Sequence, residues 1–310
     1  MISFILARFA RAVIVLVLAV TFVFVILRVS GDPAEQMLGD LASPEAIAIV
    51  RANWGLDKSI PEQFLIYAGN ALHGDFGVST TDGRPVFTII AERVPKTLII
   101  TISSFLLTVL LGVPIGILTA VRRGSAADKA VMTGAVVGYS VPSFLLGVGI
   151  IFLFAVWLRV LPSSGSSTWQ HAVLPILTGT LAGAAGISRF VRSAMIDILD
   201  QPYIAAARAD GVPEWEIILR HALPNAAIPL VTLLGFSAGG LLGGSVLIET
   251  VFAWPGLGSG FSQAVSYGNL TVVQAMVLTF TAFMVTINLT VDILYAVLNP
   301  KIRLQGNDAS

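Results

Sequence analysis

The residue types that usually do chemistry are few and scattered in this chain of 310 residues. It has no cysteine, which removes disulfides, thiolate metal ligands and thiol nucleophiles. Its three histidines, His73, His171 and His221, stand far apart, and no paired carboxylates or Ser-His-Asp arrangement converge in the sequence. We therefore expect no catalytic residue, no metal site and no cofactor on this chain, and a membrane enzyme is the weakest of the functions considered.

Three acidic side chains lie at or near the ends of long apolar segments: Asp197, Glu249 and Asp292. Acidic residues at membrane depth are candidates for function. At the end of a span, however, capping or snorkelling toward water is the simpler interpretation. Glu249 is the most informative of the three, because it directly precedes the predicted loop 252–261.

The apolar segments that must position these residues dominate the composition. Hydrophobic residues make up 55% of the chain and charged residues 12%, with a mean hydropathy of +0.87, whereas soluble domains carry about 25% charged residues. A helix needs about 20 mostly apolar residues to span a bilayer. Six blocks meet this condition, at 9–29, 98–121, 131–158, 172–195, 226–249 and 271–298. The first is interpreted as a permanent helix, because it is too long for a signal-peptide core and no small-residue cleavage site follows Arg28.

The distribution of basic residues predicts an orientation. The net charge is zero, so bulk charge gives no reason to expect nucleic-acid binding. If six spans alternate, the basic residues of the short connections gather on one side, at Arg8, Arg11, Arg122, Arg123, Lys129, Arg189, Arg192, Arg208, Arg220, Lys301 and Arg303. The positive-inside rule makes that side cytoplasmic and places both termini there.

A polar interruption at 200–224, which we call the protrusion, separates two of the apolar blocks. We expect Asp200 to cap a helix with Pro202 in its first turn, and Gly211 to end that helix in the left-handed conformation. Pro213 then starts a second helix, whose apolar residues are expected to share one face that packs on the bundle: Trp215, Ile218, Leu219, Ala222 and Leu223. An ordinary connecting loop is the alternative, but such loops are usually shorter.

Two further patterns concern packing and the polar region 30–97. Ser43 is expected to cap a short helix that starts at Pro44. The region either binds a specific partner or is a solvated loop. Within the fourth apolar block, Gly179, Gly183 and Gly186 recur at close to four-residue spacing, which favours tight helix packing, with helix motion during gating as the second interpretation.

Short motifs in a fixed order along the chain indicate a family. They are G-D-P at 31–33, G-L-D at 55–57, G-D-F-G at 74–77, R-V-P-K-T-L at 93–98, A-A-R-A-D-G at 206–211, R-H-A-L at 220–223, E-T-V-F at 249–252, W-P-G-L-G at 254–258, D-I-L-Y at 292–295 and N-P-K-I-R at 299–303. Over nearly its whole length the chain resembles the inner-membrane permease subunits of ABC importers, in the dipeptide/oligopeptide/nickel family, of the dipeptide-permease B type.

The resemblance implies an all-α membrane protein with six transmembrane helices and the type I ABC-importer permease fold. It divides the chain into an N-terminal transmembrane helix (1–30), an extracytoplasmic segment (31–97), a five-helix core (98–300) that contains the coupling loop 200–224, and a cytoplasmic tail (301–310). The expected location is the bacterial inner membrane. Expected partners are the lipid bilayer, a second related permease, two cytoplasmic ATPases that carry ATP and Mg, and an extracytoplasmic solute-binding protein, but no nucleic acid.

Two sets of site residues follow from the resemblance. The ATPase-coupling residues are Tyr203, Ala206, Ala207, Arg208, Asp210, Gly211, Glu214, Arg220 and His221. The hypothesis for an external gate or binding-protein contact involves Glu249, Phe252, Trp254, Pro255 and Gly256. The chain departs from the family pattern at Pro202 or Tyr203, Asp210 and Pro213, which puts the details of ATPase pairing in doubt but not the class.

The expected cargo is a dipeptide or oligopeptide, and the resemblance leaves nickel chelates, opines or sugars as alternatives. A secondary transporter or channel is the alternative from another class. It needs ion-coupling groups inside the membrane, and the sequence offers few candidates for them.

Overall fold

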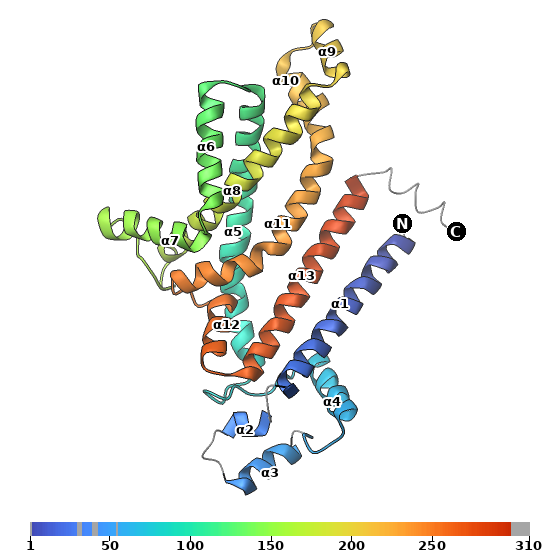
Figure 1. The fold of residues 1–310 in the computed structure, drawn as a ribbon, viewed down its shortest axis with the longest axis vertical. Coiled ribbons are helices and arrows are strands. Elements are labelled where there is room, and N and C mark those ends of the chain that lie inside the picture. The colour runs from blue at the N-terminus through green and yellow to red at the C-terminus, as the bar shows by residue number, and fades with distance from the viewer. Residues whose placement is uncertain (1, 30–32, 39–42, 54, 299–310) are drawn as a thin grey trace.

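The computed structural model of the chain describes residues 2–29, 33–38, 43–53 and 55–298 (Figure 1). Across these ranges the regular structure is helical, apart from one isolated antiparallel bridge between Val78 and Pro85. The long helices are α1 (Ile2–Val29), α5 (Val86–Val121), α8 (Gln170–Leu199), α11 (Leu223–Val251) and α13 (Leu270–Leu298). The shorter ones are α2 (Pro33–Leu38), α3 (Pro44–Asn53), α4 (Ile60–Leu72), α6 (Ala126–Ser140), α7 (Ser143–Ile151), α9 (Pro202–Ala209), α10 (Glu214–Glu216) and α12 (Leu257–Ser266), with π-helical segments η1 (Phe152–Trp157) and η2 (Ile217–Ala222). The predicted tail 301–310, the motif at 299–303 and most of the turn at 31–33 lie outside the described residues.

The helices confirm the prediction of a six-span, all-α membrane protein. Four helical stretches are long and apolar enough to cross a bilayer: Leu6–Ile26, Val86–Val121, Gln170–Leu199 and Leu270–Ile293. Two bent pairs bring the number to six, Ala126–Ser140 with Ser143–Trp157 and Glu214–Ala227 with Pro229–Gly240. Each predicted apolar block overlaps one of these helices or pairs.

The block at 131–158 is not the continuous helix that the sequence predicted. It breaks between α6 and α7 with a bend of 104°, and α7 projects sideways from the bundle in Figure 1. Pro142 has no N–H to continue the helix, and it disfavours helical geometry in the residue before it. Val141 is accordingly extended, with φ −81° and ψ 124°.

The bundle has two distinct ends. Figure 1 shows α9 and α10 at one end, and α2, α3, α4 and α12 toward the other. As predicted, Ser43 caps α3, since its Oγ accepts a hydrogen bond from the Ala46 amide at 3.2 Å. The polar region packs on the bundle through Phe24 of α1, whose ring centroid lies 5.4 Å from that of Phe64 in α4.

Close contact between α5 and α8 forms the most extensive helix pairing. Glycine allows it: a Cβ added at Gly183 would lie 2.7 Å from Thr108 Oγ1, and one at Gly116 would lie 2.5 Å from Val191 Cβ. Small residues let helix backbones approach closely within a bilayer. The glycine spacing in α8 therefore marks tight packing.

We predict that Gly116→Ala destabilises the bundle by about 1–3 kcal/mol, as overpacking does in a close-packed interior. The new methyl group would also meet the Ser188 carbonyl oxygen at 2.7 Å, which belongs to backbone and yields little. The measurement is the thermal unfolding midpoint of the purified protein. Gly134→Ala in α6 is the matched control, because a Cβ there has nothing within 4 Å. An equal response of the two variants would contradict the packing argument.

Candidate functional site

The protrusion is built from α9, α10 and η2, between the ends of α8 and α11 (Figure 1). Gly211 ends α9 with φ +79°, the left-handed conformation that the sequence predicted. Arg208 Nε lies 2.8 Å from Glu214 Oε1, which links the two short helices across this turn. Tyr203 receives a hydrogen bond of 3.3 Å from the side-chain amide of Asn225 at the start of α11. These contacts give the protrusion a defined shape.

The predicted apolar face of the protrusion is confirmed at Ala222 and Ile218, which pack in the core, and wrong at Trp215 and Leu219. Ile204, Ile217 and Ala222 are fully buried, whereas Trp215 is 59% exposed and Leu219 55% exposed. Residues 217–222, which include Leu219, form a π-helix, in which bonds of the i→i+5 type widen the turn and shift the face that points inward. Trp215 lies in α10, before this segment. Two large apolar side chains therefore lie on the surface of the protrusion.

The predicted cap at Asp200 is also wrong. Gln201 holds the N-cap position of α9 and makes no side-chain cap bond. Asp200 instead ends α8 and forms an ion pair with Arg123, with 2.8 Å between Nη1 and Oδ2. Because Arg123 follows α5, the pair joins the base of the protrusion to the α5–α6 turn.

The residues predicted for ATPase coupling lie mostly on the surface of the protrusion. Exposed positions are Tyr203, Ala206, Arg208, Asp210, Gly211, Glu214 and Arg220, and half-buried positions are Ala207 and His221. The Arg220 guanidinium pairs with Glu216 one turn earlier. The structure thus brings the predicted set together on one exposed unit.

At the opposite end of the bundle, Glu249 is a fully buried carboxylate that caps α12 from another helix. Gly256 is the N-cap residue of α12 and has no side chain to supply a cap. Glu249 Oε2 accepts a hydrogen bond of 3.0 Å from the Ser259 amide in the first turn of α12. Helix N-termini favour negative groups because their first amides have no partner within the helix. A Cβ at Gly256 would lie 2.4 Å from Glu249 Oε2, so only glycine leaves room for this cap.

Three residues of α5 complete the arrangement, which we call the α5–α12 clamp (Arg93, Lys96 and Thr97 with 249–259). The Thr97 hydroxyl donates to Glu249 Oε1 at 2.7 Å and accepts from the Leu257 amide, also at 2.7 Å. The Trp254 indole N–H donates to the Lys96 carbonyl oxygen at 2.9 Å. Arg93 donates to the Gly256 carbonyl oxygen at 3.0 Å. The motifs at 93–98 and 249–258 are therefore two halves of one structure.

The residues predicted for an external gate lie mainly inside this clamp. Glu249, Phe252, Trp254 and Gly256 are buried and Pro255 is half-buried. Between them Ala253 has φ +47°, a conformation that costs a non-glycine residue about 1 kcal/mol or more. Sequence reasoning gave no role to Arg93 or Thr97, although their motif was recognised. The signal that pairs them with 249–259 is spatial, and one sequence does not contain it.

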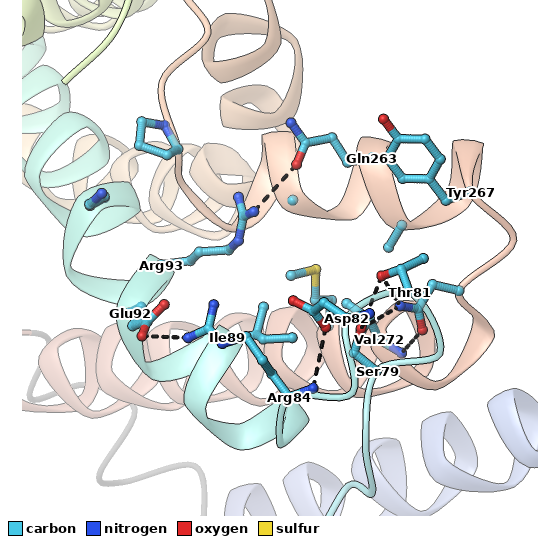
Figure 2. Close-up of a pocket in the computed structure, with 16 residues that line it drawn as sticks. Ser79, Thr81, Asp82, Arg84, Ile89, Glu92, Arg93, Gln263, Tyr267 and Val272 are labelled. Atoms are coloured by element: carbon cyan, nitrogen blue, oxygen red, sulfur yellow. Dashed lines mark hydrogen bonds and ion pairs between the residues drawn. The ribbon is translucent and has the colours of Figure 1, made fainter. Parts of the chain in front are cut away.

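A pocket of about 260 Å³ opens beside the clamp, between loop 79–84, the first turns of α5, and the helices α12 and α13 (Figure 2). Asn269 fixes one wall, because its side-chain amide donates to the Ser79 hydroxyl at 2.9 Å. A hydrogen bond from the Ser79 hydroxyl holds the pKa of Asp82 below its ordinary value. Arg84 pairs with Glu92 at 2.6 Å on the rim. We call this cavity the α12 pocket.

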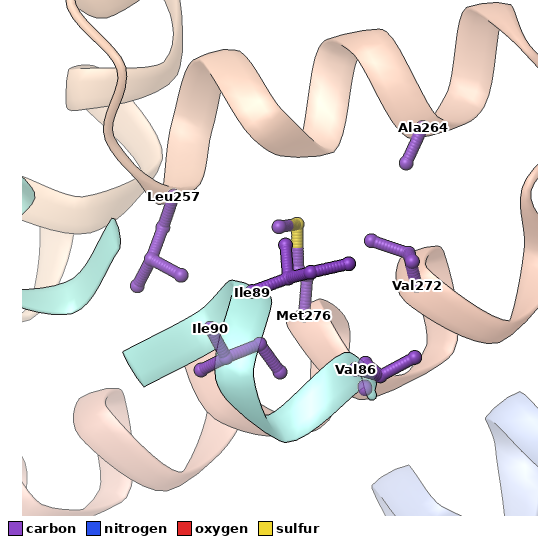
Figure 3. Close-up of a cluster of buried hydrophobic side chains, with 8 residues drawn as sticks. Val86, Ile89, Ile90, Leu257, Ala264, Val272 and Met276 are labelled. Atoms are coloured by element: carbon purple, nitrogen blue, oxygen red, sulfur yellow. The ribbon is translucent and has the colours of Figure 1, made fainter. Parts of the chain in front are cut away.

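Part of the lining of the α12 pocket is apolar and packed. Four of its lining residues, Ile89, Ala264, Val272 and Met276, also belong to a hydrophobic cluster with Val86, Ile90, Leu257 and Ala275 (Figure 3). In the part of the chain that the structure describes, no group of three or more His, Asp or Glu side chains is placed to hold a metal ion. The pocket thus combines polar and charged side chains with part of a packed apolar cluster.

Comparison with known proteins shows the family of the chain. The family model "Binding-protein-dependent transport system inner membrane component" matches residues 112–304, and the corresponding N-terminal model matches residues 1–101. The chain belongs to this family. It is a permease subunit of an ABC importer in the dipeptide/oligopeptide group, a multi-pass inner-membrane protein and not an enzyme, and ATP hydrolysis resides on partner subunits.

Relatives match along the full length. The glutathione transport system permease protein GsiC of Salmonella choleraesuis is 43% identical over 304 residues, which cover 98% of this chain and 99% of the relative. The protein of the same name from Escherichia coli K12 is 42% identical over the same share of each chain. A solved chain of the MetNI methionine ABC transporter, in an inward-facing conformation, has a TM-score of 0.58 at 26% identity and covers 68% of this chain and 96% of its own. The predicted permease fold is confirmed.

Proposed function

We propose that this permease subunit forms half of the translocation pathway of an importer for small peptides. The observation that carries the proposal is the identity of 42–43% over 98% of the chain to permeases named for glutathione, a tripeptide. A second, related permease supplies the other half of the pathway. The extracytoplasmic binding protein selects the peptide and delivers it. The two permeases therefore need fewer specific contacts with the peptide than the binding protein does.

The protrusion is proposed to face the cytoplasm and to dock into the ATPase. The positive-inside rule supports this orientation, because the basic residues Arg123, Arg192 and Arg208 lie at the protrusion end of the spans. The same orientation places both termini in the cytoplasm and α2–α4 outside. Exposed Trp215 and Leu219 support docking, since large apolar side chains on a rigid surface unit are typical interface anchors.

Transport then follows from two states of one rigid unit. ATP binding closes the partner ATPases, and the protrusion moves with the cleft that holds it. Because the protrusion is packed on α8 and α11 through Ala222 and Ile218, its displacement tilts these spans. The ATPases shift the equilibrium only through contacts that differ between the two states. In this scheme ATP and Mg stay on the partners, and the permease binds no cofactor of its own.

The test is reconstitution of the permease pair in liposomes with the ATPases inside and the binding protein outside. We expect uptake of labelled glutathione or a dipeptide that requires ATP and the binding protein together. Ligands that co-purify with the binding protein identify the peptide class. Uptake driven by an ion gradient in the absence of the ATPases would contradict the proposal, and ATP-dependent uptake of a nickel chelate, opine or sugar alone would correct the substrate.

A further inference from the structure

The α12 pocket carries an excess of positive charge. Its lining contains the acids Asp82 and Glu92 and the cations Arg84, Arg93 and Lys96. Arg84 and Glu92 neutralise each other, and Asp82 accepts a hydrogen bond from the backbone amide of Arg84. Three cations against two acids leave a net charge of +1, because Asp82 keeps its own charge. Arg93 and Lys96 are three residues apart and so on neighbouring positions of the α5 surface.

Neither of these two cations lies within ion-pair distance of a carboxylate in the described residues, although Glu92 on the same helix interacts electrostatically with both. Arg93 is held at the edge of the pocket by two neutral oxygens. It donates to Gly256 O at 3.0 Å and to Gln263 Oε1 at 3.3 Å, and Figure 2 shows the second of these bonds. Those bonds use two of its five N–H donors. Lys96 is a half-buried residue that lines the pocket. Its ammonium group has no hydrogen-bond partner in the described part of the chain. Two cations on neighbouring positions of one helix supply the charge that favours a carboxylate.

The pocket is small for a cargo site. Four of its lining residues, among them Ile89, Val272 and Met276, belong to a packed apolar cluster (Figure 3). Its volume of about 260 Å³ is also below the range of roughly 300–1,000 Å³ that is common for small-molecule sites. A socket of this kind suits a side chain presented by a macromolecule.

We propose that the α12 pocket is a docking socket for an Asp or Glu side chain of the extracytoplasmic binding protein, which Arg93 and Lys96 receive. The assignment of this partner rests on the proposed orientation, which places the pocket outside. A charged socket next to the α5–α12 clamp also gives docking a direct route to the first turn of α12. Arg93 takes part in both, since it binds Gly256 of the clamp and lines the socket.

The first experiment measures the affinity of the binding protein for the permease complex in nanodiscs at low and physiological salt. We expect Lys96→Glu to weaken binding at least tenfold and to remove most of its salt dependence, and Lys96→Arg to retain it. Lys58→Glu is the matched control, because Lys58 is exposed in the polar region and lies outside the pocket. Equal affinities for Lys96→Glu and the unmodified complex would overturn the proposal.

A second experiment identifies the contact directly. A zero-length carbodiimide cross-linker joins an amine to a carboxylate that touches it, and we expect a cross-linked peptide that joins Lys96 to an Asp or Glu of the binding protein. Lys96→Arg should lose this product. Protection of Lys96 from amine labelling by a free acidic dipeptide, without the binding protein, would instead make the pocket a peptide site and overturn the docking role. Failure of the unmodified complex to bind any binding protein would contradict the proposed function itself.

Discussion

Replacing Trp215 and Leu219 together by alanine is expected to abolish ATPase co-purification and peptide uptake while the permease still inserts and folds. Both side chains are more than half exposed, so their truncation leaves the buried contacts of Ile204, Ile217 and Ala222 in place. Truncation of a buried aromatic anchor at an interface typically costs about 2–4 kcal/mol, which is roughly a 30- to 700-fold loss of affinity. The measurements are ATPase recovery with the tagged permease and ATP-dependent uptake in liposomes.

The matched control for this variant is Tyr267→Ala. Tyr267 is an aromatic residue at the other end of the bundle and is 74% exposed. Its loss should leave ATPase recovery unchanged. Gly211→Pro gives a second arm, because proline fixes φ near −65° and Gly211 has φ +79°. ATPase recovery that survives both changes to the protrusion would show that the ATPase docks elsewhere.

The membrane spans could be predicted from the sequence because the bilayer imposes one simple condition, about 20 apolar residues in a helix. Hydropathy does not show where a helix begins or ends. α5 begins at Val86, ahead of the apolar block at 98, since Glu92, Arg93 and Lys96 continue the helix while lowering its hydropathy. Hydropathy also gives no sign of the break at Pro142, because the residues on both sides of it are equally apolar.

The protrusion shows where single-sequence reasoning succeeds and where it fails. The conformation of Gly211 is predictable, because the left-handed turn that ends many helices is one that glycine adopts most readily. The side of 217–222 that faces inward is not predictable in the same way. The prediction assumes a helical period of 3.6 residues, and η2 has a wider turn. The error places Trp215 and Leu219 inside, and its correction supplies the surface that the proposed function needs.

The α5–α12 clamp lay beyond prediction although both of its motifs were recognised. Thr97 and Glu249 are 152 residues apart in the chain, and nothing in one sequence pairs them. The interpretation of Glu249 as a residue at the end of a span was sound as far as it went. Glu249, however, caps a different helix, α12. The glycines at 256 and 258 are explained by this carboxylate, because a Cβ at either position would lie too close to Glu249 Oε2.

Glu249→Ala is expected to destabilise the permease by about 2–4 kcal/mol, the second large effect that the structure predicts. The change leaves the Ser259 amide and the Thr97 hydroxyl buried without an acceptor, and a lost partner for a buried donor costs about 1–3 kcal/mol. The void left by the side chain adds to this cost. Glu249→Gln keeps the volume and one acceptor oxygen, so about half of the loss is expected. The measurement is the unfolding midpoint of the purified complex.

Glu92→Ala is the matched control, because Glu92 lies in the same helix as Thr97 but is exposed, and its ion pair is with Arg84. We expect its unfolding midpoint to equal that of the unmodified complex. The ATPase activity stimulated by the binding protein separates stability from gating. If Glu249→Gln folds well and loses this stimulation, the clamp transmits docking to the spans. If Glu249→Ala unfolds at the unmodified temperature, the carboxylate does not hold α12, because two buried donors without an acceptor cannot be neutral.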